Sequence, residues 1–301
     1  MKEFLKPVYN GAYSFLRTTL AFNPFIAKKI SGKKVLNGHA RYEQETNPDL
    51  DLEIVRELKQ FGLPVGSYWI DQDRFMNYLD LDLYSKEYYH AGKVRDSAFI
   101  EKALEHFISI DLLKPTKDSV CIDVGSGNSP FGRILTKICG TKNSYRQDLC
   151  FPGGVTGDKI GGDASSMPFD DNSVDAITLH CAFEHFEGRT DVKFLAEAQR
   201  VLKKGGKLII LPFYLSSAYT IHLDPVNNIL KAKSPVIEDD EAVIRYCDSR
   251  QSFSRHYDPK AMKKRLLSSI TGMHIDLFHV KNFRIIHPDC YLRFIALFTK
   301  Q

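Results

Sequence analysis

The chain has 301 residues, of which 43% are hydrophobic and 26% are charged. This composition is typical of a globular protein and excludes disordered, collagen-like and coiled-coil classes. The formal net charge of +4 is too small to indicate a nucleic-acid partner, and we expect none.

The first 70 residues are rich in Phe, Tyr and Lys and are interrupted by Pro and Gly. We expect a helical N-terminal extension over 1–70 that packs on the main domain. The alternative is a peripheral dock on an anionic membrane surface, because residues 1–40 carry seven basic and one acidic side chain among aromatic ones.

Two absences in the sequence bear on the location of the protein. No apolar stretch reaches the roughly 18 residues that a transmembrane helix needs, and the N-terminus lacks a secretory signal pattern. The six cysteines form no CxxC pair and have no histidine at zinc-ligand spacing. We therefore predict a cytoplasmic protein with reduced cysteines and no structural metal, with contact at the inner face of the membrane as the alternative.

From about residue 95 onwards, helix-like and strand-like segments alternate, which predicts an α/β fold with a mostly parallel sheet. A helix with one apolar face ends near Pro115, and a second helix precedes Gly205-Gly206 as its stop. A third helix is expected over 259–269. Strands are expected at 119–124, 144–149, before Asp163, and at 174–179, 207–213, 273–280 and 291–299. We assign a main domain to 71–301, with a long excursion at 215–257.

The most informative segment, residues 120–132, reads Val-Cys-Ile-Asp-Val-Gly-Ser-Gly-Asn-Ser-Pro-Phe-Gly. A buried strand leads into a loop with Gly125 and Gly127, where the backbone can approach a ligand closely. The dinucleotide fingerprint has a third glycine where this chain has Pro130, and no Gly-Lys-Ser/Thr follows, so a Walker A loop is excluded. By itself, a glycine pair fits any nucleotide cofactor.

Other features follow this loop in a fixed order. Asp148 ends the second strand, where an acid can take both ribose hydroxyls. Asp163-Ala164 ends the third strand and precedes Met-Pro-Phe-Asp-Asp-Asn-Ser-Val-Asp at 167–175. Ala-Phe-Glu-His-Phe at 182–186 follows the fourth strand, and Arg-Val-Leu-Lys-Lys-Gly-Gly at 200–206 precedes the fifth.

Together, residues 119–213 resemble the class I S-adenosylmethionine-dependent methyltransferases, in particular the small-molecule enzymes. The resemblance implies a Rossmann-like, seven-stranded, mostly parallel sheet with helices on both faces and a reversed last strand. It also implies S-adenosyl-L-methionine as cofactor, with Asp148 on the ribose, Asp163 and Ala164 at the adenine, and the backbone near His180 at the amino group. Asp123, Gly125, Ser126 and Gly127 are expected at the methionine part.

Two features of the resemblance stay open. Arg95, or Lys93, is expected to pair with the methionine carboxylate, with a solvated helix start as the alternative. The crossover between Asp148 and Asp163 has only 14 residues, five of them glycine, which is too short for the helix usual in this family. One face of the sheet therefore needs another cover, for which the N-terminal segment is the candidate.

For catalysis, His185 is the predicted general base, because it follows the fourth strand and histidine titrates near neutrality. The alternative is a histidine that orders the loop. His222, two residues before Asp224, is a second catalytic candidate, with a turn before Pro225 as its alternative. The excursion also carries Arg245, Arg250 and Arg255, which predict either an anionic acceptor or a salt-bridged surface.

The absence of one known motif limits the class of the methyl acceptor. The Asn/Asp-Pro-Pro-Tyr/Phe turn of base-methylating enzymes is replaced here by Cys181-Ala182-Phe183-Glu184, which argues against a nucleic-acid base. We expect O-methylation of a hydroxyl on a sugar, a glycan or another polar metabolite. The alternatives are a lipid or quinone-type acceptor at the membrane, and a cofactor-binding regulator without turnover.

Overall fold

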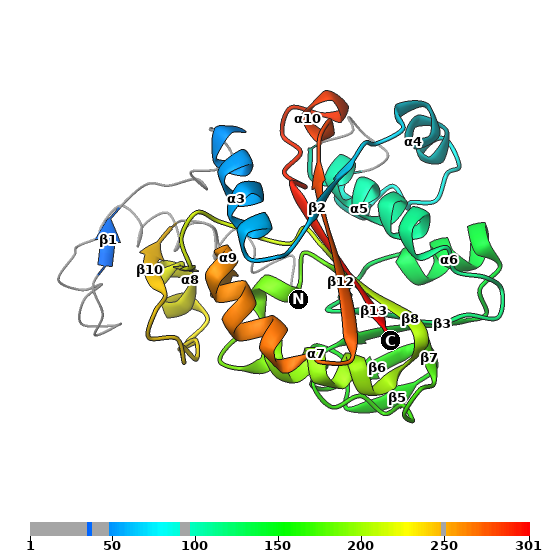
Figure 1. The fold of residues 1–301 in the computed structure, drawn as a ribbon. Helices are drawn as coiled ribbons and strands as arrows, with labels where there is room; N and C mark the ends of the chain where they lie inside the picture. Colours follow the sequence, from blue (N-terminus) through cyan, green and yellow to red (C-terminus); the bar gives the residue numbers. More distant parts are fainter. Residues whose placement is uncertain (1–34, 38–47, 91–96, 248–250) are drawn as a thin grey trace. The chain divides into compact units, whose positions relative to one another are not determined.

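The computed structural model describes residues 35–37, 48–90, 97–247 and 251–301 (Figure 1). Apart from residues 35–37, the predicted membrane dock over residues 1–40 lies outside these residues, as does the pair Lys93 and Arg95. No helix within the described ranges is long and apolar enough to cross a membrane.

The chain divides into two compact units. The large unit comprises residues 55–183, 190–214 and 263–301. Among the described residues, the small unit comprises 35–37, 48–54, 184–189, 215–247 and 251–262. Because the excursion groups with the loop 184–189, two segments far apart in the sequence form one unit.

In the described residues, nine strands form the sheet of the large unit, in the order β2-β12-β13-β8-β7-β3-β4-β6-β5. They are β2 (Val65–Tyr68), β3 (Val120–Val124), β4 (Asn143–Asp148), β5 (Gly154–Thr156), β6 (Lys159–Gly161), β7 (Val174–His180), β8 (Leu202–Leu211), β12 (Met273–Val280) and β13 (Phe294–Lys300).

The middle seven strands, β12 to β6, are the sheet that the sequence predicts. β3 pairs in parallel with β4 and β7, and β7 pairs in parallel with β8. β13 is antiparallel to both β8 and β12, so the last strand is reversed as expected. The α/β, Rossmann-like fold is therefore confirmed.

Two edge strands were not predicted. β2 pairs in parallel with β12 and lies inside the segment 1–70, so residues 65–68 belong to the sheet and not to a separate extension. β5 and β6 form an antiparallel hairpin in the glycine-rich crossover, where β6 is the expected weak strand before Asp163. A hairpin needs fewer residues than a helix, which explains how so short a segment makes this connection.

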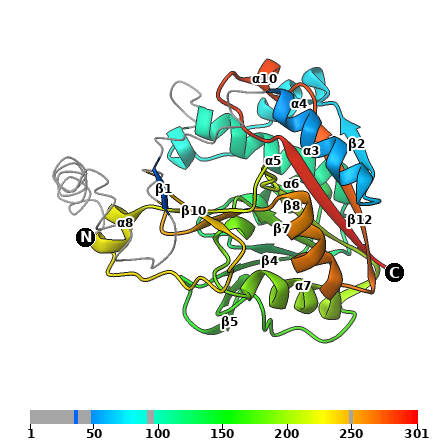
Figure 2. The same ribbon diagram turned by 60° about the vertical axis from the view of Figure 1, so that its left-hand side comes forward.

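The helices are α3 (Pro48–Gln60), α4 (Gln72–Leu79), α5 (Ser97–Leu113), α6 (Phe131–Cys139), α7 (Thr190–Val201), α8 (Pro225–Leu230), α9 (Pro259–Ala261) and α10 (Phe283–Ile286). The short 3-10 helices in the described residues are η2 (Tyr88–His90), η3 (Phe183–His185) and η5 (Leu267–Ser269), and η4 (Met262–Leu266) is a short π-helix. α5 and α6 lie on one side of the large sheet and α7 lies on the other (Figures 1 and 2).

The apolar periods of the sequence explain the packing of α5 and α7. α5 buries Phe99, Ala103, Leu104 and Ile108 in a core shared with β8 and β13. α7 buries Phe194, Leu195 and Ala198. It ends at Val201, before the expected Gly205-Gly206 stop, because Leu202 already pairs with Val174 of β7.

The small unit has its own four-stranded sheet, in the order β1-β10-β9-β11. The strands are β1 (Val35–Asn37), β9 (Thr220–Leu223), β10 (Val243–Tyr246) and β11 (Ser254–His256). β9 pairs in parallel with β10 and antiparallel with β11. The excursion 215–257 therefore contributes to a second sheet, although its sequence has no clear apolar periodicity. The sequence did not predict this sheet because its strands have only three or four residues.

Candidate active site

The loop between β3 and α6 begins at Gly125, and its two glycines have different roles. Both have positive φ, +66° at Gly125 and +49° at Gly127. A Cβ built on Gly125 would lie 2.6 Å from Cβ of Ala182, so this glycine is needed for the loop to pack on the residues after β7. At Gly127 the nearest atom, Oδ2 of Asp148, is 3.9 Å from such a Cβ. The open approach to the backbone is therefore at Gly127.

Asp148 ends β4 beside this loop. Its Oδ2 accepts the N–H of Gly127 at 2.7 Å, and its Oδ1 accepts the N–H of Cys150 at 2.8 Å. The N–H of Ser126 donates to the carbonyl of Gln147 at 3.0 Å, which fixes the loop to the end of β4. Because each carboxylate oxygen has a second lone-pair site, Asp148 keeps acceptor capacity for a ligand hydroxyl.

Asp163 and Ala164 follow β6, the next strand of the sheet. Asp163 is exposed and its Oδ1 accepts the N–H of Ser165 at 2.8 Å, while Ala164 is buried. β6 pairs in parallel with β4, so the turn after β6 lies at the same sheet edge as Asp148. The structure thus brings the predicted ribose and adenine residues to one edge.

Asp123 and His180 are joined to each other at the ends of β3 and β7. Oδ1 of Asp123 accepts from Nδ1 of His180 at 2.9 Å and from the Thr178 hydroxyl at 2.8 Å. Nδ1 donates to this carboxylate, and Nε2 is 2.9 Å from the Ser109 hydroxyl. Both ring nitrogens of His180 have hydrogen-bond partners within the protein. A cofactor group at this position would therefore bind to the backbone and not to the imidazole.

A buried carboxylate oxygen without a hydrogen-bond partner among the described residues indicates that a ligand could bind here. Oδ2 of Asp123 is buried and has no hydrogen-bond partner within the described part of the chain. A buried carboxylate oxygen without a partner costs free energy, which a ligand donor would recover. The residues present therefore fit a polar cofactor at the carboxyl ends of β3 and β4.

His185 lies in the small unit, in a loop that is held from several sides. Its Nδ1 is 2.6 Å from the carbonyl of Phe253, which only accepts, so Nδ1 carries the proton and Nε2 is the basic nitrogen. Nε2 is 3.5 Å from Oε1 of Glu184, and the side chain is 35% exposed. The role of His185 as general base stays a prediction.

Arg255 holds the same loop and corrects the interpretation of the arginine cluster. Its guanidinium is fully buried and donates to the carbonyls of Phe186 and Gly188 and to Asp239, at 2.6, 2.8 and 2.9 Å. Arg255 is therefore a structural clamp and not a contact for an anionic acceptor. Arg250 lies outside the described residues.

His222 is buried on β9, and its ring centroid is 4.5 Å from that of His256. Burial, with a smaller effect of Arg245, lowers the pKa of His222 to about 4, so the ring is neutral. Asp224 accepts the N–H of Asn227 as the N-cap of α8, which is the turn before Pro225 that the sequence allows. The catalytic role of His222 stays a prediction.

Across residues 35–37, 48–90, 97–247 and 251–301, no group of three or more His, Cys, Asp or Glu could hold a metal ion.

Residues 122–210 match a family described as a methyltransferase domain. The chain is 32% identical over 109 residues to a demethylmenaquinone methyltransferase of Thermotoga maritima, which covers 34% of this chain and 47% of that protein. It is 31% identical over 112 residues to the ubiquinone/menaquinone biosynthesis C-methyltransferase UbiE of Hydrogenovibrio crunogenus, covering 35% and 41%. The chain thus spans less than half the length of these relatives.

Among solved structures, the chain is similar to the 1,6-didemethyltoxoflavin-N1-methyltransferase of Burkholderia thailandensis. The identity is 15%, the TM-score is 0.47, and the match covers 79% of this chain and 93% of that one. The match at 122–210 spans β3 to β8 and includes the loop at Gly125 and the strand end at Asp148. Residues 122–210 of this chain therefore match a methyltransferase domain.

Proposed function

We propose that this protein binds S-adenosyl-L-methionine at the β3–α6 loop and transfers its methyl group to a small-molecule acceptor. The observation that carries this proposal is the junction of Gly127 and Asp148 at the adjoining ends of two parallel strands. The orphaned Oδ2 of Asp123 lies at the end of the same strand, β3. The match to a methyltransferase-domain family over these residues supports it.

The cofactor, when bound, supplies a methyl group activated by a sulfonium. Asp148 would hold the ribose, Asp163 and Ala164 the adenine, and the Gly125–Gly127 loop with the backbone near His180 the methionine part. Since the methyl group is already activated, alignment supplies most of the rate, and a base is needed when the acceptor must lose a proton. His185 is our proposed base, since its Nε2 is set in the accepting tautomer.

The sequence left two classes of acceptor open, a sugar or other polar metabolite and a lipid or quinone-type molecule, and the relatives favour the second. Their names specify quinone substrates, so we propose a quinone-type acceptor in its reduced, hydroxyl-bearing form as the first to test. Nothing in the comparisons supports the sugar or glycan acceptor that we expected. The relatives match only about a third of the chain, so the acceptor must be tested directly.

Titration calorimetry with S-adenosylhomocysteine tests the cofactor site. Asp148→Asn should weaken binding by about 1–3 kcal/mol, the range for hydrogen bonds to a charged group. Asp158→Asn is the matched control, because this exposed aspartate pairs with Arg146 at 2.8 Å outside the proposed site. It should leave affinity unchanged. No binding by the unmodified protein would contradict the proposal.

Methyl transfer from labelled cofactor to a panel of hydroquinones, phenols and sugars then tests the acceptor. Label in a hydroquinone or phenol supports the quinone-type class, and label only in sugars overturns it. Binding of S-adenosylhomocysteine without transfer to any acceptor would favour the non-catalytic regulator.

A further inference from the structure

Helix α5 buries a polar stripe in addition to its apolar face. Glu101, Glu105 and Ser109, spaced four residues apart, and His106 beside them are each fully buried. Residues four apart lie one above the other on a helix, so the two carboxyl groups form one column. Buried carboxyl groups are rare unless they are paired or serve a function.

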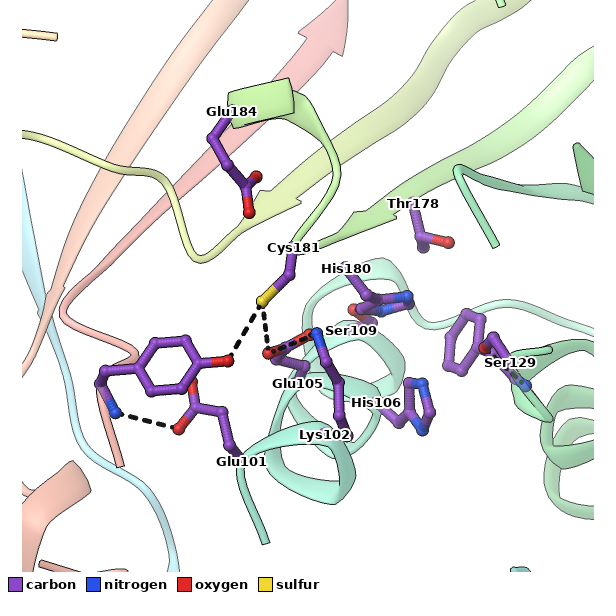
Figure 3. A network of polar contacts seen from close by, with 12 residues as sticks. Glu101, Lys102, Glu105, His106, Ser109, Ser129, Thr178, His180, Cys181 and Glu184 are labelled. Carbon is purple, nitrogen blue, oxygen red and sulfur yellow. Dashed lines mark hydrogen bonds and ion pairs between the residues drawn. The ribbon is translucent and has the colours of Figure 1, made fainter. Parts of the chain in front are cut away.

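Lys102 and two residues from other segments complete a cluster around Glu105 (Figure 3). Nζ of Lys102 donates to Oε1 and Oε2 of Glu105 at 3.1 and 2.9 Å. The thiol of Cys181 donates to Oε1 of the same carboxylate at 3.1 Å, and its sulfur is 3.5 Å from the hydroxyl of Tyr291. All of these residues belong to the large unit.

Glu101 is the incompletely paired member of this cluster. Its Oε2 accepts the N–H of Tyr291 at 3.1 Å, whereas Oε1 is buried and has no hydrogen-bond partner in the part of the chain that is described. Burial, together with the neighbouring Glu105 carboxylate, raises the pKa of Glu101 to about 8. At neutral pH this carboxyl group therefore carries a proton that it can donate to a ligand.

Lys102 keeps its charge. Burial opposes the charge of its ammonium group, but Cys181 and Glu105 outweigh that effect and raise the pKa of Lys102. Its side chain is 13% exposed, whereas that of Glu105 is fully buried, and Cys181 and Tyr291 are half-buried. The cluster thus has a buried acidic end and a partly accessible end with a cation, a thiol and a phenol.

The cluster lies beside the proposed methyl-transfer site and is bordered by aromatic rings. Cys181 directly follows His180, has a positive φ of +48°, and thereby leaves the end of β7 in a turn. The ring of His180 lies 4.7 Å from that of Phe131 and 4.8 Å from that of His106, between centroids. Tyr88, half-buried, is 6.4 Å from His106.

We propose that Glu101, Lys102, Glu105, Cys181 and Tyr291 form the acceptor subsite and that they bind and deprotonate a phenolic hydroxyl. This inference rests on the proposed methyltransferase function and specifies the acceptor's reacting group. The acceptor hydroxyl takes the place of the Cys181 thiol as donor to Glu105. Its O–H bond breaks, the electron pair stays on the acceptor oxygen, and the proton passes to the Glu105 carboxylate. Glu105 thereby takes the role of base proposed above for His185, and the turnover of His185→Ala decides between the two.

The charges of the cluster select this class of ligand. The oxyanion that forms is paired with the ammonium of Lys102, and the hydroxyl of Tyr291 can donate to it. A carboxylate ligand is repelled by the charged Glu105 carboxylate. An alcohol of a sugar is far less acidic than a phenol, whose pKa near 10 is within reach of a neighbouring ammonium.

The probe for this subsite is 4-nitrophenol, whose anion absorbs visible light and whose neutral form does not. The full chain should bind it and lower the pH of its half-ionisation by about 1 to 3 pH units, the usual effect of an adjacent opposite charge. Lys102→Met should abolish this shift, and Tyr291→Phe, which removes only a hydroxyl, should reduce it. Lys142→Met, a change at an exposed lysine outside the cluster, should keep the full shift.

Lys102→Met leaves the buried Glu105 without its cation, so folding needs its own control. The double variant Lys102→Met with Glu105→Gln removes both charges, and circular dichroism and calorimetry with S-adenosylhomocysteine show whether each variant is folded. A folded Lys102 variant that retains the full shift, or an unmodified protein that produces none, overturns the inference. If the shift is present but S-adenosylhomocysteine does not bind, the proposed function fails and the phenol subsite stands.

Discussion

The imidazole of His180 and the carboxylate of Asp123 meet across two neighbouring parallel strands, with Nδ1 and Oδ1 2.9 Å apart. The two residues are 57 positions apart in the chain. This contact turns one oxygen of Asp123 towards His180 and Thr178 and leaves Oδ2 for a ligand. We therefore expect His180 to contribute to the cofactor site by orienting Asp123.

Replacing His180 by Phe keeps an aromatic ring but removes the donor to Asp123. We expect the free energy of unfolding to fall by about 1–3 kcal/mol, the range for a hydrogen bond to a charged group. Urea denaturation followed by the fluorescence of Trp69, the single tryptophan, measures it in the large unit. His274→Phe is the control, because its contact with Asp276 at 3.2 Å is largely exposed. Equal losses in the two variants would contradict the buried contact.

Gly125→Ala should destabilise the protein more than Gly127→Ala. Both changes place a side chain at positive φ, a strain of about 1–3 kcal/mol. Only Gly125→Ala also brings a Cβ to 2.6 Å from Ala182. The double variant Gly125→Ala with Ala182→Gly removes that contact and should regain part of the loss in urea denaturation. No recovery in the double variant would show that the close approach is not the cause.

If His185 is the general base, His185→Ala should reduce turnover by roughly 10²–10⁴-fold. Unchanged turnover would leave Glu105 as the base. The affinity for S-adenosylhomocysteine should stay nearly unchanged, because the cofactor contacts proposed above involve other residues. Label transfer and calorimetry measure the two quantities, with the half-buried His287→Ala as control. A parallel loss of cofactor affinity would indicate a structural histidine instead.

The small unit should lose stability as the pH falls below neutrality. The pKa of His222 is about 4 in the folded protein and 6.5 ordinarily, so between these values the unfolded chain binds a proton that the folded ring does not. Stability is therefore present above pH 6.5 and is lost progressively towards pH 4. From pH 7 to pH 5 the loss from this residue is about 2 kcal/mol.

Amide hydrogen exchange of β9 at pH 7 and pH 5, corrected for intrinsic rates, measures this loss. His222→Gln should show a smaller dependence on pH. An unchanged pH dependence in the variant would assign the effect to another group.

The sequence by itself determined the central sheet and the cofactor loop, because these depend on local patterns. A short apolar run makes a buried strand, and glycines permit the positive φ after β3, whichever residues surround them. The predicted strands at 144–149 and 273–280 correspond to β4 and β12, and the apolar face of the first helix is buried as expected. The order of the motifs was sufficient to predict the methyltransferase domain that residues 122–210 match.

Tertiary structure alone decided which charged residues are buried. In the sequence, Glu101, Lys102 and Glu105 look like the solvated side of a helix, because their partners Cys181 and Tyr291 lie at least 76 positions away. From the sequence, Arg255 could equally well be a ligand contact. In the structure, its guanidinium donates hydrogen bonds to carbonyls 67 and 69 positions away. Whether a charge faces water or a partner depends on contacts between distant segments, and no local pattern encodes those contacts.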